Sequence, residues 1–182
     1  ILNHKVIYDF RNEDLKNGGQ GAPISPIYHK LILENLNISS PSLIINIGGI
    51  TNLTYWDGMH LIGFDVGPGN NLMDYYTKTY LNSNFDMDGK IASMGKHSKK
   101  LVNKFCENSF FQISPPKSLE RRHLFENKIL KEIYSLNKFD CLATLTFLIC
   151  HTIALSYSFL PKKPKAAIIV GGGANNKNLI KN

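Results

Sequence analysis

The chain has 182 residues, a formal net charge of +7 and a composition that is 43% hydrophobic. This length predicts one large domain, or one and a half, with a real hydrophobic core. There is no run of roughly 18 or more apolar residues, which argues against a membrane span. The three scattered cysteines, Cys106, Cys141 and Cys150, form no C-x-x-C pair and are typical of reduced cytosolic thiols.

The first residues carry no secretion signal. Ile1-Leu2-Asn3-His4 lacks a basic start and a long apolar centre, and the absence of an initiator Met predicts a fragment or an internal start. Lys5 to Phe10 predicts a short strand, with the charged Asp9 and Arg11 at its end. Gly18 to Pro23 predicts a flexible loop of polar backbone. A surface turn held by an Asp–Arg pair explains these residues equally well.

Pro26 to Leu36 predicts a helix, with Ile27, Leu31 and Ile32 on one face. A lone helical histidine is more often packed than catalytic, so His29 is left out of the candidate site. Ser39 to Ser42 predicts a short linker.

The stretch from Leu43 to Asp74 predicts three strands followed by a helix. The strands are expected at 43–47, 50–56 and 59–64, with an Asp57-Gly58 hairpin turn between the last two. Asp65 follows the third strand and faces a loop of Gly67, Pro68 and Gly69. Asn70 is the expected N-cap of a helix that carries Leu72, Met73, Tyr76 and Tyr80 at helical spacing.

Two glycine turns in this stretch suit an anionic ligand. Gly48-Gly49 lets backbone N–H groups approach an anion without a Cβ in the way. The loop of Gly67 and Gly69 opens a helix, whose dipole favours the same ligand. With Asp65 as a base beside the loop, this pattern indicates phosphoryl transfer. A plain β-meander with tight glycine turns remains an alternative.

The middle of the chain predicts a polar loop over 82–89 and helices over 91–106 and 124–136. Asp86 and Asp88 lack the full spacing of a calcium loop, and Asp86 is given only a positioning role. Phe110-Phe111 is expected under the loop 114–118. Lys117 and Arg121 either contact phosphate or sugar, or pair with acids such as Glu120. The expected core residues of the helix over 91–106 are Leu101, Val102 and Phe105.

The last third predicts a long buried helix and a strand. Asp140 is the expected N-cap of a helix over 141–159, in which His151 is a core histidine and the buried stripe is Leu145, Leu148, Thr152 and Leu155. A strand over 165–170 then leads into Gly171, Gly172, Gly173 and Asn175. This turn offers backbone to a flat or anionic ligand. It is not G-x-G-x-x-G, so a Rossmann dinucleotide site is a poor interpretation.

The positive charge is dispersed over the chain. The densest run, 161–165, is best explained as a solvated turn before a strand. A positive field still suits an anionic substrate such as ATP.

Five ordered motifs resemble the anhydro-N-acetylmuramic acid kinases of the sugar kinase, Hsp70 and actin superfamily. They are DFRNEDLKNGGQGAPISPIYH (9–29), NIGGITNLTYW (46–56) with GFDVGPGNNLMD (63–74), FDMDG (85–89), PPKS (115–118) and IIVGGGANNKNL (168–179). After PPKS the chain departs from the family, because many members continue with T-G-R-E and an aromatic residue. Here Arg121 matches the family arginine, whereas the glutamate is displaced or lost.

The resemblance implies an α/β fold of the ribonuclease H-like, actin/Hsp70-type class. Residues 1–40 would be the tail of a first domain and the crossover, and residues 43–182 most of the second, nucleotide-binding domain. It implies ATP-dependent conversion of 1,6-anhydro-N-acetylmuramic acid and water to N-acetylmuramic acid 6-phosphate in peptidoglycan recycling. Mg²⁺ would accompany ATP without dedicated protein ligands. A cytoplasmic location, no nucleic-acid or membrane partner, and a homodimer of the full-length protein are compatible with it.

The resemblance also implies the roles of individual residues. Asp65 would be the general base that takes a proton from water. Nucleotide contacts would come from Gly48, Gly49, Gly67, Gly69, Gly171, Gly172, Gly173 and Asn175. Sugar contacts would come from Asp9, Arg11, Gly19, Gln20 and Gly21.

The family's first glycine loop, of the G-T-S-x-D-G type, and its last helix are missing from this sequence. We therefore expect weak ATP binding, uncovered apolar surface along 166–170, and an open strand edge at 6–8. We also expect such a chain to aggregate or dimerise. An inactive remnant, one half of a split kinase, another sugar kinase, and a noncatalytic nucleic-acid-binding fragment remain as alternatives.

Overall fold

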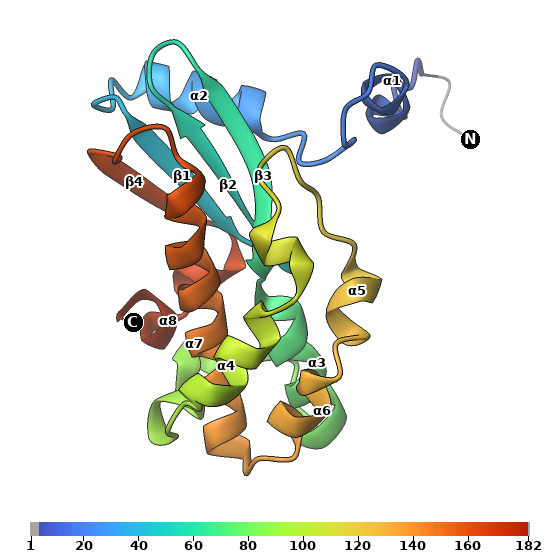
Figure 1. Ribbon diagram of the computed structural model, residues 1–182, viewed down its shortest axis with the longest axis vertical. Helices are drawn as coiled ribbons and strands as arrows, with labels where there is room; N and C mark the ends of the chain where they lie inside the picture. Colours follow the sequence, from blue (N-terminus) through green and yellow to red (C-terminus); the bar gives the residue numbers. More distant parts are fainter. Residues whose placement is uncertain (1–3, 182) are drawn as a thin grey trace.

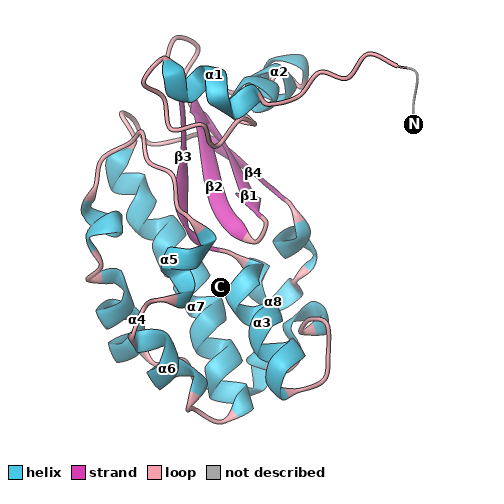
Figure 2. Cartoon of the chain, turned by 90° about the vertical axis from the view of Figure 1, so that its right-hand side faces the viewer, coloured by secondary structure: helices cyan, strands magenta, loops and turns pink. Residues whose placement is uncertain are grey.

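A computed structural model describes residues 4–181; the opening Ile1-Leu2-Asn3 and the final Asn182 lie outside the described residues. A four-stranded sheet lies at one end of the molecule, and a group of helices extends beyond it (Figure 1). Figure 2 shows the same division from the side. The chain is therefore a mixed α/β protein, as its sequence predicts.

The sheet has the strand order β3-β2-β1-β4. Its strands are β1 (Ser42–Ile47), β2 (Ile50–Trp56), β3 (Leu61–Pro68) and β4 (Ala166–Val170). β1 pairs antiparallel with β2 and parallel with β4, and β2 pairs antiparallel with β3. β1 is buried along almost its whole length, because elements cover both of its faces and strands lie on both of its edges.

The third strand differs from the prediction. It begins at Leu61, after a loop in which the Asp57 carboxylate accepts the N–H groups of Met59 and His60, and it continues to Pro68. Asp65 therefore lies within the strand, not after its end. The strand extends this far because Asp65 pairs with Asn52 on one side and donates its backbone N–H to the Lys117 carbonyl on the other, at 3.0 Å. A register shift between Thr51 and Asn52 marks a bulge opposite this point.

The expected strand over 5–10 is wrong. These residues are irregular until α1 (Phe10–Lys16) begins, and the side chains of Val6, Ile7 and Tyr8 are 68%, 75% and 80% exposed. A strand needs a partner for its backbone groups, and no strand of the described chain lies beside this segment. The expected open strand edge at 6–8 is therefore wrong as well.

The helix α2 (Pro26–Asn35) covers one face of the sheet, over β2 and β3. The apolar face expected at Ile27, Leu31 and Ile32 is not the face that packs on the sheet, since Ile27 and Leu31 are exposed while His29 and Leu33 are buried. His29 Nδ1 lies 2.7 Å from Thr54 Oγ1 on β2. The helix approaches this closely because Gly63 has no side chain where Pro26 packs.

The helix α7 (Lys138–Ser156) covers the opposite face. Asn137, not Asp140, is its N-cap, and its side chain accepts the N–H groups of Phe139 and Asp140. Within residues 4–181, one helical stretch, Lys138–Phe159, is long and apolar enough to cross a membrane, with 56% of its window buried inside the structure. The helix itself is predicted from the sequence over 141–159, and its interspersed threonines and His151 leave no continuous apolar run of membrane-spanning length.

The remaining α-helices lie between β3 and β4 in the chain, apart from α8 at the carboxyl-terminal end. They are α3 (Asn70–Tyr80), α4 (Lys99–Cys106), α5 (Arg121–Phe125), α6 (Ile129–Tyr134) and α8 (Lys177–Lys181). Gly69, not Asn70, occupies the N-cap position of α3. The predicted core residues of 91–106 and of the α7 stripe are confirmed at Leu101, Val102, Phe105, Leu145, Leu148 and Thr152, whereas Leu155, predicted in the same stripe, is exposed.

Two predicted long helices are broken. The stretch over 91–106 stops at Gly95, where a Cβ would collide with the Phe139 carbonyl at the start of α7. The stretch over 124–136 stops after Phe125, and Asn127 Oδ1 accepts the Ile129 N–H to begin α6. The first break comes from a contact with a residue far away in sequence and the second from a local hydrogen bond, and periodicity indicates neither.

Candidate active site

Asp65 is a buried carboxylate with one oxygen engaged and one open. Its Oδ2 accepts the Leu119 backbone N–H at 2.8 Å and the Ser118 hydroxyl at 3.3 Å. Among residues 4–181, none donates a hydrogen bond to Oδ1. Asp65 is only 6% exposed, and it lines a hollow beside the sheet. It is thus fixed by one oxygen while the other is left for a ligand.

Burial raises the pKa of the Asp65 carboxyl above its ordinary value of 3.8. The hydrogen bonds from Leu119 and Ser118 and the positive charge of Arg11 oppose this shift, but burial dominates. A carboxylate with a raised pKa is a better proton acceptor than an ordinary aspartate. The environment of Asp65 therefore suits a general base.

The amino-terminal glycine loop closes one side of this hollow. The Asp14 carboxylate accepts the Gly21 N–H at 2.6 Å, and the Asp14 carbonyl accepts the Gly19 N–H at 2.8 Å. A Cβ at Gly19 would collide with the Asp14 carboxylate, so any larger residue would displace the side chain that accepts the Gly21 N–H. The loop thereby places Arg11 and Gly21 at the hollow with Asp65.

The hollow has a volume of about 630 Å³ and lies among the amino-terminal loop, the sheet and the segment after Pro116. Three arginines, Arg11, Arg121 and Arg122, line it, together with Glu120. Arg121 stacks over Phe125 at 5.5 Å, and Arg122 pairs with Glu126 at 3.1 Å. Its other lining residues are Gly21, Ala22, Pro23, Ile24, Ser25, Ile50, Asn52, Asp65, Ser118 and Leu119.

The three glycine turns meet at the end of β1. The Gly69 and Asn70 N–H groups donate to the carbonyls of Gly49 and Gly48 at 3.0 and 2.7 Å. A Cβ at Gly171 would lie 2.7 Å from the Ile47 carbonyl, and one at Gly173 would collide with the Ile47 side chain. Gly48-Gly49 and Gly171–Gly173, far apart in sequence, therefore lie next to each other in space.

The backbone amides at this junction are not equivalent. Those of Gly69, Asn70 and Asn71 already donate to the Gly48 and Gly49 carbonyls, so these three amides at the start of α3 are not free for a ligand. Within the described part of the chain, the amides of Gly48 and Gly49 themselves donate no hydrogen bond. The Gly48-Gly49 turn therefore has amides free for an anion, and so do Gly172 and Gly173, whose amides also donate no hydrogen bond within residues 4–181.

A second cavity, of about 430 Å³, lies beside the Gly172 turn. Its walls combine the apolar side chains of Met73, Phe85 and Met87 with polar groups from Asn70, Asp74 and Asn175. The Asp86 carboxylate accepts the Ile91 and Ala92 N–H groups at 2.9 Å each. Asp86 thus orders this wall, in agreement with its predicted positioning role.

The two hollows are distinct, because they share no lining residue among residues 4–181. Gly172 and Asn175 line the second cavity, whereas Asp65 lines the first. The Gly48-Gly49 turn lies between them, because Ile50 lines the first and Asn70, bound to the Gly48 carbonyl, lines the second. A ligand that reaches both hollows has to pass this turn.

The other predicted sugar contacts lie apart from the hollow. Asp9 accepts the Asn12 side-chain amide at 2.5 Å, and Asp9, Gly19 and Gln20 are not among the lining residues. The structure adds Asn52 and Ser118, which the sequence analysis missed as site residues. Ser118 lies in the PPKS stretch and Asn52 in the NIGGITN stretch, so the motif match was the only available signal.

Lys117 follows neither of its two predicted roles. Its ammonium is buried, donates to the Phe110 carbonyl at 3.1 Å, and lies 4.3 Å from the centre of the Phe159 ring. Burial lowers the pKa of Lys117 to about 8.

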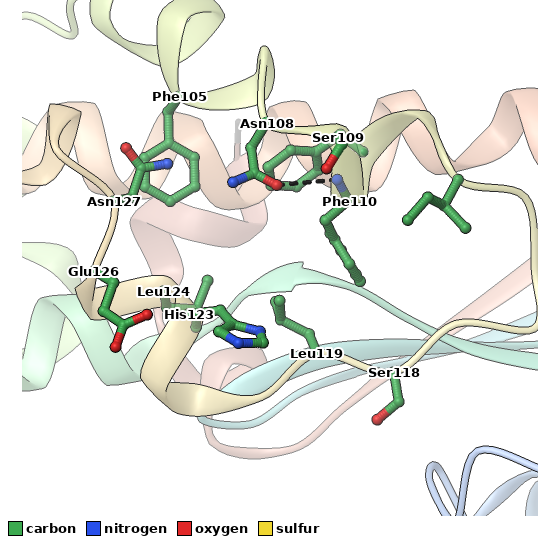
Figure 3. A pocket seen from close by; sticks show the side chains of 12 residues that line it. Phe105, Asn108, Ser109, Phe110, Ser118, Leu119, His123, Leu124, Glu126 and Asn127 are labelled. Atoms are coloured by element: carbon green, nitrogen blue, oxygen red, sulfur yellow. Dashed lines mark hydrogen bonds between the residues drawn. The ribbon is translucent and has the colours of Figure 1, made fainter.

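A third cavity, of about 460 Å³, lies on the other side of Ser118 and Leu119 (Figure 3). Its walls combine apolar side chains, such as Phe105, Phe110 and Leu124, with polar ones, such as Asn108, His123 and Glu126. No group of three or more His, Cys, Asp or Glu side chains that could hold a metal occurs within residues 4–181.

Comparison with known proteins agrees with the motifs. The sequence model of the anhydro-N-acetylmuramic acid kinase family matches residues 3–182. Curated proteins named anhydro-N-acetylmuramic acid kinase are similar to the chain. The one from Hydrogenovibrio crunogenus is 38% identical over 179 residues, and the match covers 96% of this chain and 48% of that protein.

Two further relatives with the same name give a similar match. The protein of Bradyrhizobium diazoefficiens is 37% identical over 177 residues, covering 97% of this chain and 47% of that protein. The protein of Rhodopseudomonas palustris strain CGA009 is 39% identical over 177 residues, with the same shares. The chain therefore spans about half the length of these relatives.

Proposed function

The chain belongs to the anhydro-N-acetylmuramic acid kinase family, and we propose that it forms the part of such a kinase that carries the general base. The observation that supports this is Asp65: a buried carboxylate with a raised pKa, held by one oxygen and open by the other to a hollow lined by arginines. The proposed reaction converts 1,6-anhydro-N-acetylmuramic acid, ATP and water to N-acetylmuramic acid 6-phosphate and ADP.

We propose that residues 43–182 form most of the second, nucleotide-binding domain of a ribonuclease H-like, actin-type protein. The sheet supports this, since its first three strands are antiparallel and the fourth returns parallel beside β1. Residues 1–40 would link this domain to the first one. The irregular course of residues 5–9 and their exposed apolar side chains fit a segment that belongs against another part of a larger protein.

In the proposed reaction, Asp65 Oδ1 accepts a proton from a water molecule. The oxygen of that water forms a bond to the anomeric carbon of the sugar, and the bond from this carbon to O6 of the anhydro bridge breaks. O6 then forms a bond to the γ-phosphorus of ATP, and ADP leaves. The raised pKa of Asp65 helps the first proton transfer, because the carboxylate holds a proton more readily.

The arginine-lined hollow suits an anionic sugar. Muramic acid carries a carboxylate on its lactyl group, and a guanidinium binds a carboxylate with two parallel hydrogen bonds. Arg11 and Arg121 are the candidates, since no ion pair of the described chain engages either of them, whereas Arg122 is paired with Glu126. Gly21 lets the backbone lie close to Arg11, and Asp9, Gly19 and Gln20 are proposed to reach the sugar only in the larger protein.

The proposed path of ATP runs from the second cavity to the Gly48-Gly49 turn. The adenine would lie against Met73, Phe85 and Met87, beside Gly172 and Asn175. The unengaged amides of Gly48 and Gly49 would bind the phosphates. Gly67, Gly69, Gly171 and Gly173 would serve by allowing the turns to pack closely.

A protein-built magnesium site does not fit the described residues, because Asp65 stands alone and no acidic cluster accompanies it. Magnesium in kinases is often held mainly by phosphate oxygens and water. Mg²⁺ would therefore arrive with ATP, and no residue of this chain is assigned to it. The proposal also includes a cytoplasmic location and small-molecule rather than nucleic-acid or membrane partners. It further includes a homodimer of the whole protein.

The test is a chimera in which this chain replaces the matching half of the Hydrogenovibrio crunogenus relative. The purified chimera is given Mg-ATP and the anhydro sugar in ¹⁸O-labelled water, and the product is sampled promptly by mass spectrometry. We expect a sugar phosphate that carries one ¹⁸O on the anomeric carbon and none on phosphorus. A folded chimera that makes no sugar phosphate would favour an inactive remnant instead.

A further inference from the structure

The segment Lys117-Ser118-Leu119, named the base clamp here, holds Asp65 through both its backbone and its side chain. The Lys117 carbonyl accepts the Asp65 N–H at 3.0 Å, so the segment pairs with the free edge of β3. The Leu119 N–H and the Ser118 hydroxyl then donate to Oδ2 at 2.8 and 3.3 Å. All three contacts come from consecutive residues, so the base clamp acts on Asp65 as a unit.

Lys117 ties the base clamp to the rest of the molecule. Its ammonium donates to the Phe110 carbonyl and lies 4.3 and 4.7 Å from the ring centres of Phe159 and Phe110. No carboxylate of the described chain pairs with it. A buried ammonium without an anionic partner is costly, and cation–π contacts and a hydrogen bond offset only part of the cost. An apolar side chain would fill this site more cheaply, so packing alone does not account for a lysine.

We propose that the base clamp is a positioning device for Asp65, in which Leu119 and Ser118 fix Oδ2 so that only Oδ1 faces the sugar, and Lys117 anchors the clamp. Lys117 is then a positioning residue, not a phosphate ligand. This proposal rests on the assignment of Asp65 as the general base in the proposed function. Its structural claims, however, concern the free chain and can be measured without turnover.

The base clamp also controls how strongly Asp65 holds a proton. The two donors to Oδ2 favour the ionised carboxylate, whereas burial favours the protonated form. Removing the Ser118 donor should raise the pKa of Asp65 further. Removing the Lys117 anchor should let the clamp open more often, which exposes the Leu119 and Asp65 amides to solvent exchange.

The experiment is nuclear magnetic resonance of the 182-residue chain with ¹⁵N and aspartate-carboxyl ¹³C labels. Asp65→Asn assigns the Asp65 carboxyl signal. We expect the Leu119 amide to titrate with the same midpoint as the Asp65 carboxyl. Ser118→Ala should raise that midpoint by about 0.5–1 pH unit, the size of one lost hydrogen bond. Lys117→Met should speed exchange of the Leu119 and Asp65 amides about tenfold, and exposed Lys100→Met should not.

A Leu119 amide that ignores the titration of Asp65, or an unchanged midpoint in Ser118→Ala, would overturn the proposal. Unchanged exchange in Lys117→Met would overturn the anchoring role of Lys117. If Lys117→Met does not fold, Ser118→Ala still decides whether the base clamp sets the pKa. An inactive chimera would count against the kinase assignment and leave these measurements unaffected, so the two failures are distinguishable.

Discussion

The hollow beside Asp65 and the cavity beside Gly172 each contain a buried carboxylate, but the two carboxylates are used differently. Asp65 is 6% exposed and Asp86 is 5% exposed. Both oxygens of Asp86 accept hydrogen bonds, from the Ile91 and Ala92 amides, whereas only Oδ2 of Asp65 accepts them. Equal burial therefore does not mean equal function: the carboxylate with an unengaged oxygen is available for chemistry, and the saturated one shapes a loop.

The same contrast applies to the glycines of the two regions. At the junction between them, Gly69 and Gly171 lie where a Cβ would meet the carbonyls of Gly48 and Ile47. Gly172 lines the cavity, and a Cβ there would lie 3.3 Å from the side-chain amide nitrogen of Asn70. Some glycines thus let backbone turns pack, and others keep a cavity open.

The largest expected effect comes from removing the base. In the chimera, Asp65→Asn should lower turnover by about 10²–10⁴-fold, because the amide cannot accept a proton. Its stability should change little, since the Asn oxygen can still accept from Leu119 and Ser118. Steady-state kinetics and thermal melting check both parts. A variant with near-normal turnover would remove Asp65 from the base role.

A pair of glycine variants tests the junction. Gly171 has φ +85° and a Cβ there would lie 2.7 Å from the Ile47 carbonyl, so Gly171→Ala should cost at least about 1–2 kcal/mol of unfolding free energy from its backbone conformation alone. Gly172→Ala should keep the fold and weaken nucleotide binding. Denaturant unfolding and calorimetric titration of Mg-ATP into each chimera check this. Equal effects of the two variants on stability would contradict the division of roles.

Asp86→Asn is the counterpart of the Asp65 variant. Both Asp86 oxygens accept hydrogen bonds from the Ile91 and Ala92 amides, and the substitution replaces one of these oxygens with a nitrogen. It should therefore lower the free energy of unfolding by about 1–3 kcal/mol. Turnover of the folded variant should stay within a few fold of the parent. Urea unfolding and kinetics under folding conditions measure the two effects. If Asp86→Asn abolished turnover without a loss of stability, the contrast between the two carboxylates would fail.

The smallest effect is on pH dependence. The pKa of Asp65 is raised in the folded state, so its protonated form contributes stability below the ordinary value of 3.8, and this contribution is lost as pH rises through the raised pKa. Relative to Asp65→Asn, the parent chain should lose about 1.4 kcal/mol per unit of pKa shift over that window. Over the same window, turnover should rise as the base ionises. A stability difference that does not change with pH would contradict the raised pKa.

The sequence by itself determined the central sheet. Two strands and the Gly48-Gly49 turn between 43 and 74 follow from local rules, because apolar runs end in glycines there. The two-residue Asp57-Gly58 turn is wrong, since residues 57–60 form the loop between β2 and β3. The strand over 166–170 and the cores of α4 and α7 follow in the same way. The family, too, was identifiable from ordered motifs, because each motif is a contiguous run of residues.

Long-range contacts decided the rest. Whether 5–10 forms a strand depends on a neighbouring strand, and the inward face of α2 depends on the space left by Gly63. The length of β3 depends on the Lys117 carbonyl, more than 50 residues away in sequence. Local patterns register none of these partners.

The candidate site shows the same division. Sequence supplied Asp65 and the glycines, but not which oxygen or amide stays unengaged. Only the tertiary structure showed that Leu119 and Ser118 donate hydrogen bonds to Asp65 Oδ2. It also showed that the first amides of α3 donate to the Gly48 and Gly49 carbonyls. A residue's type fixes the hydrogen bonds it can make, whereas its neighbours in space determine which of them remain for a ligand.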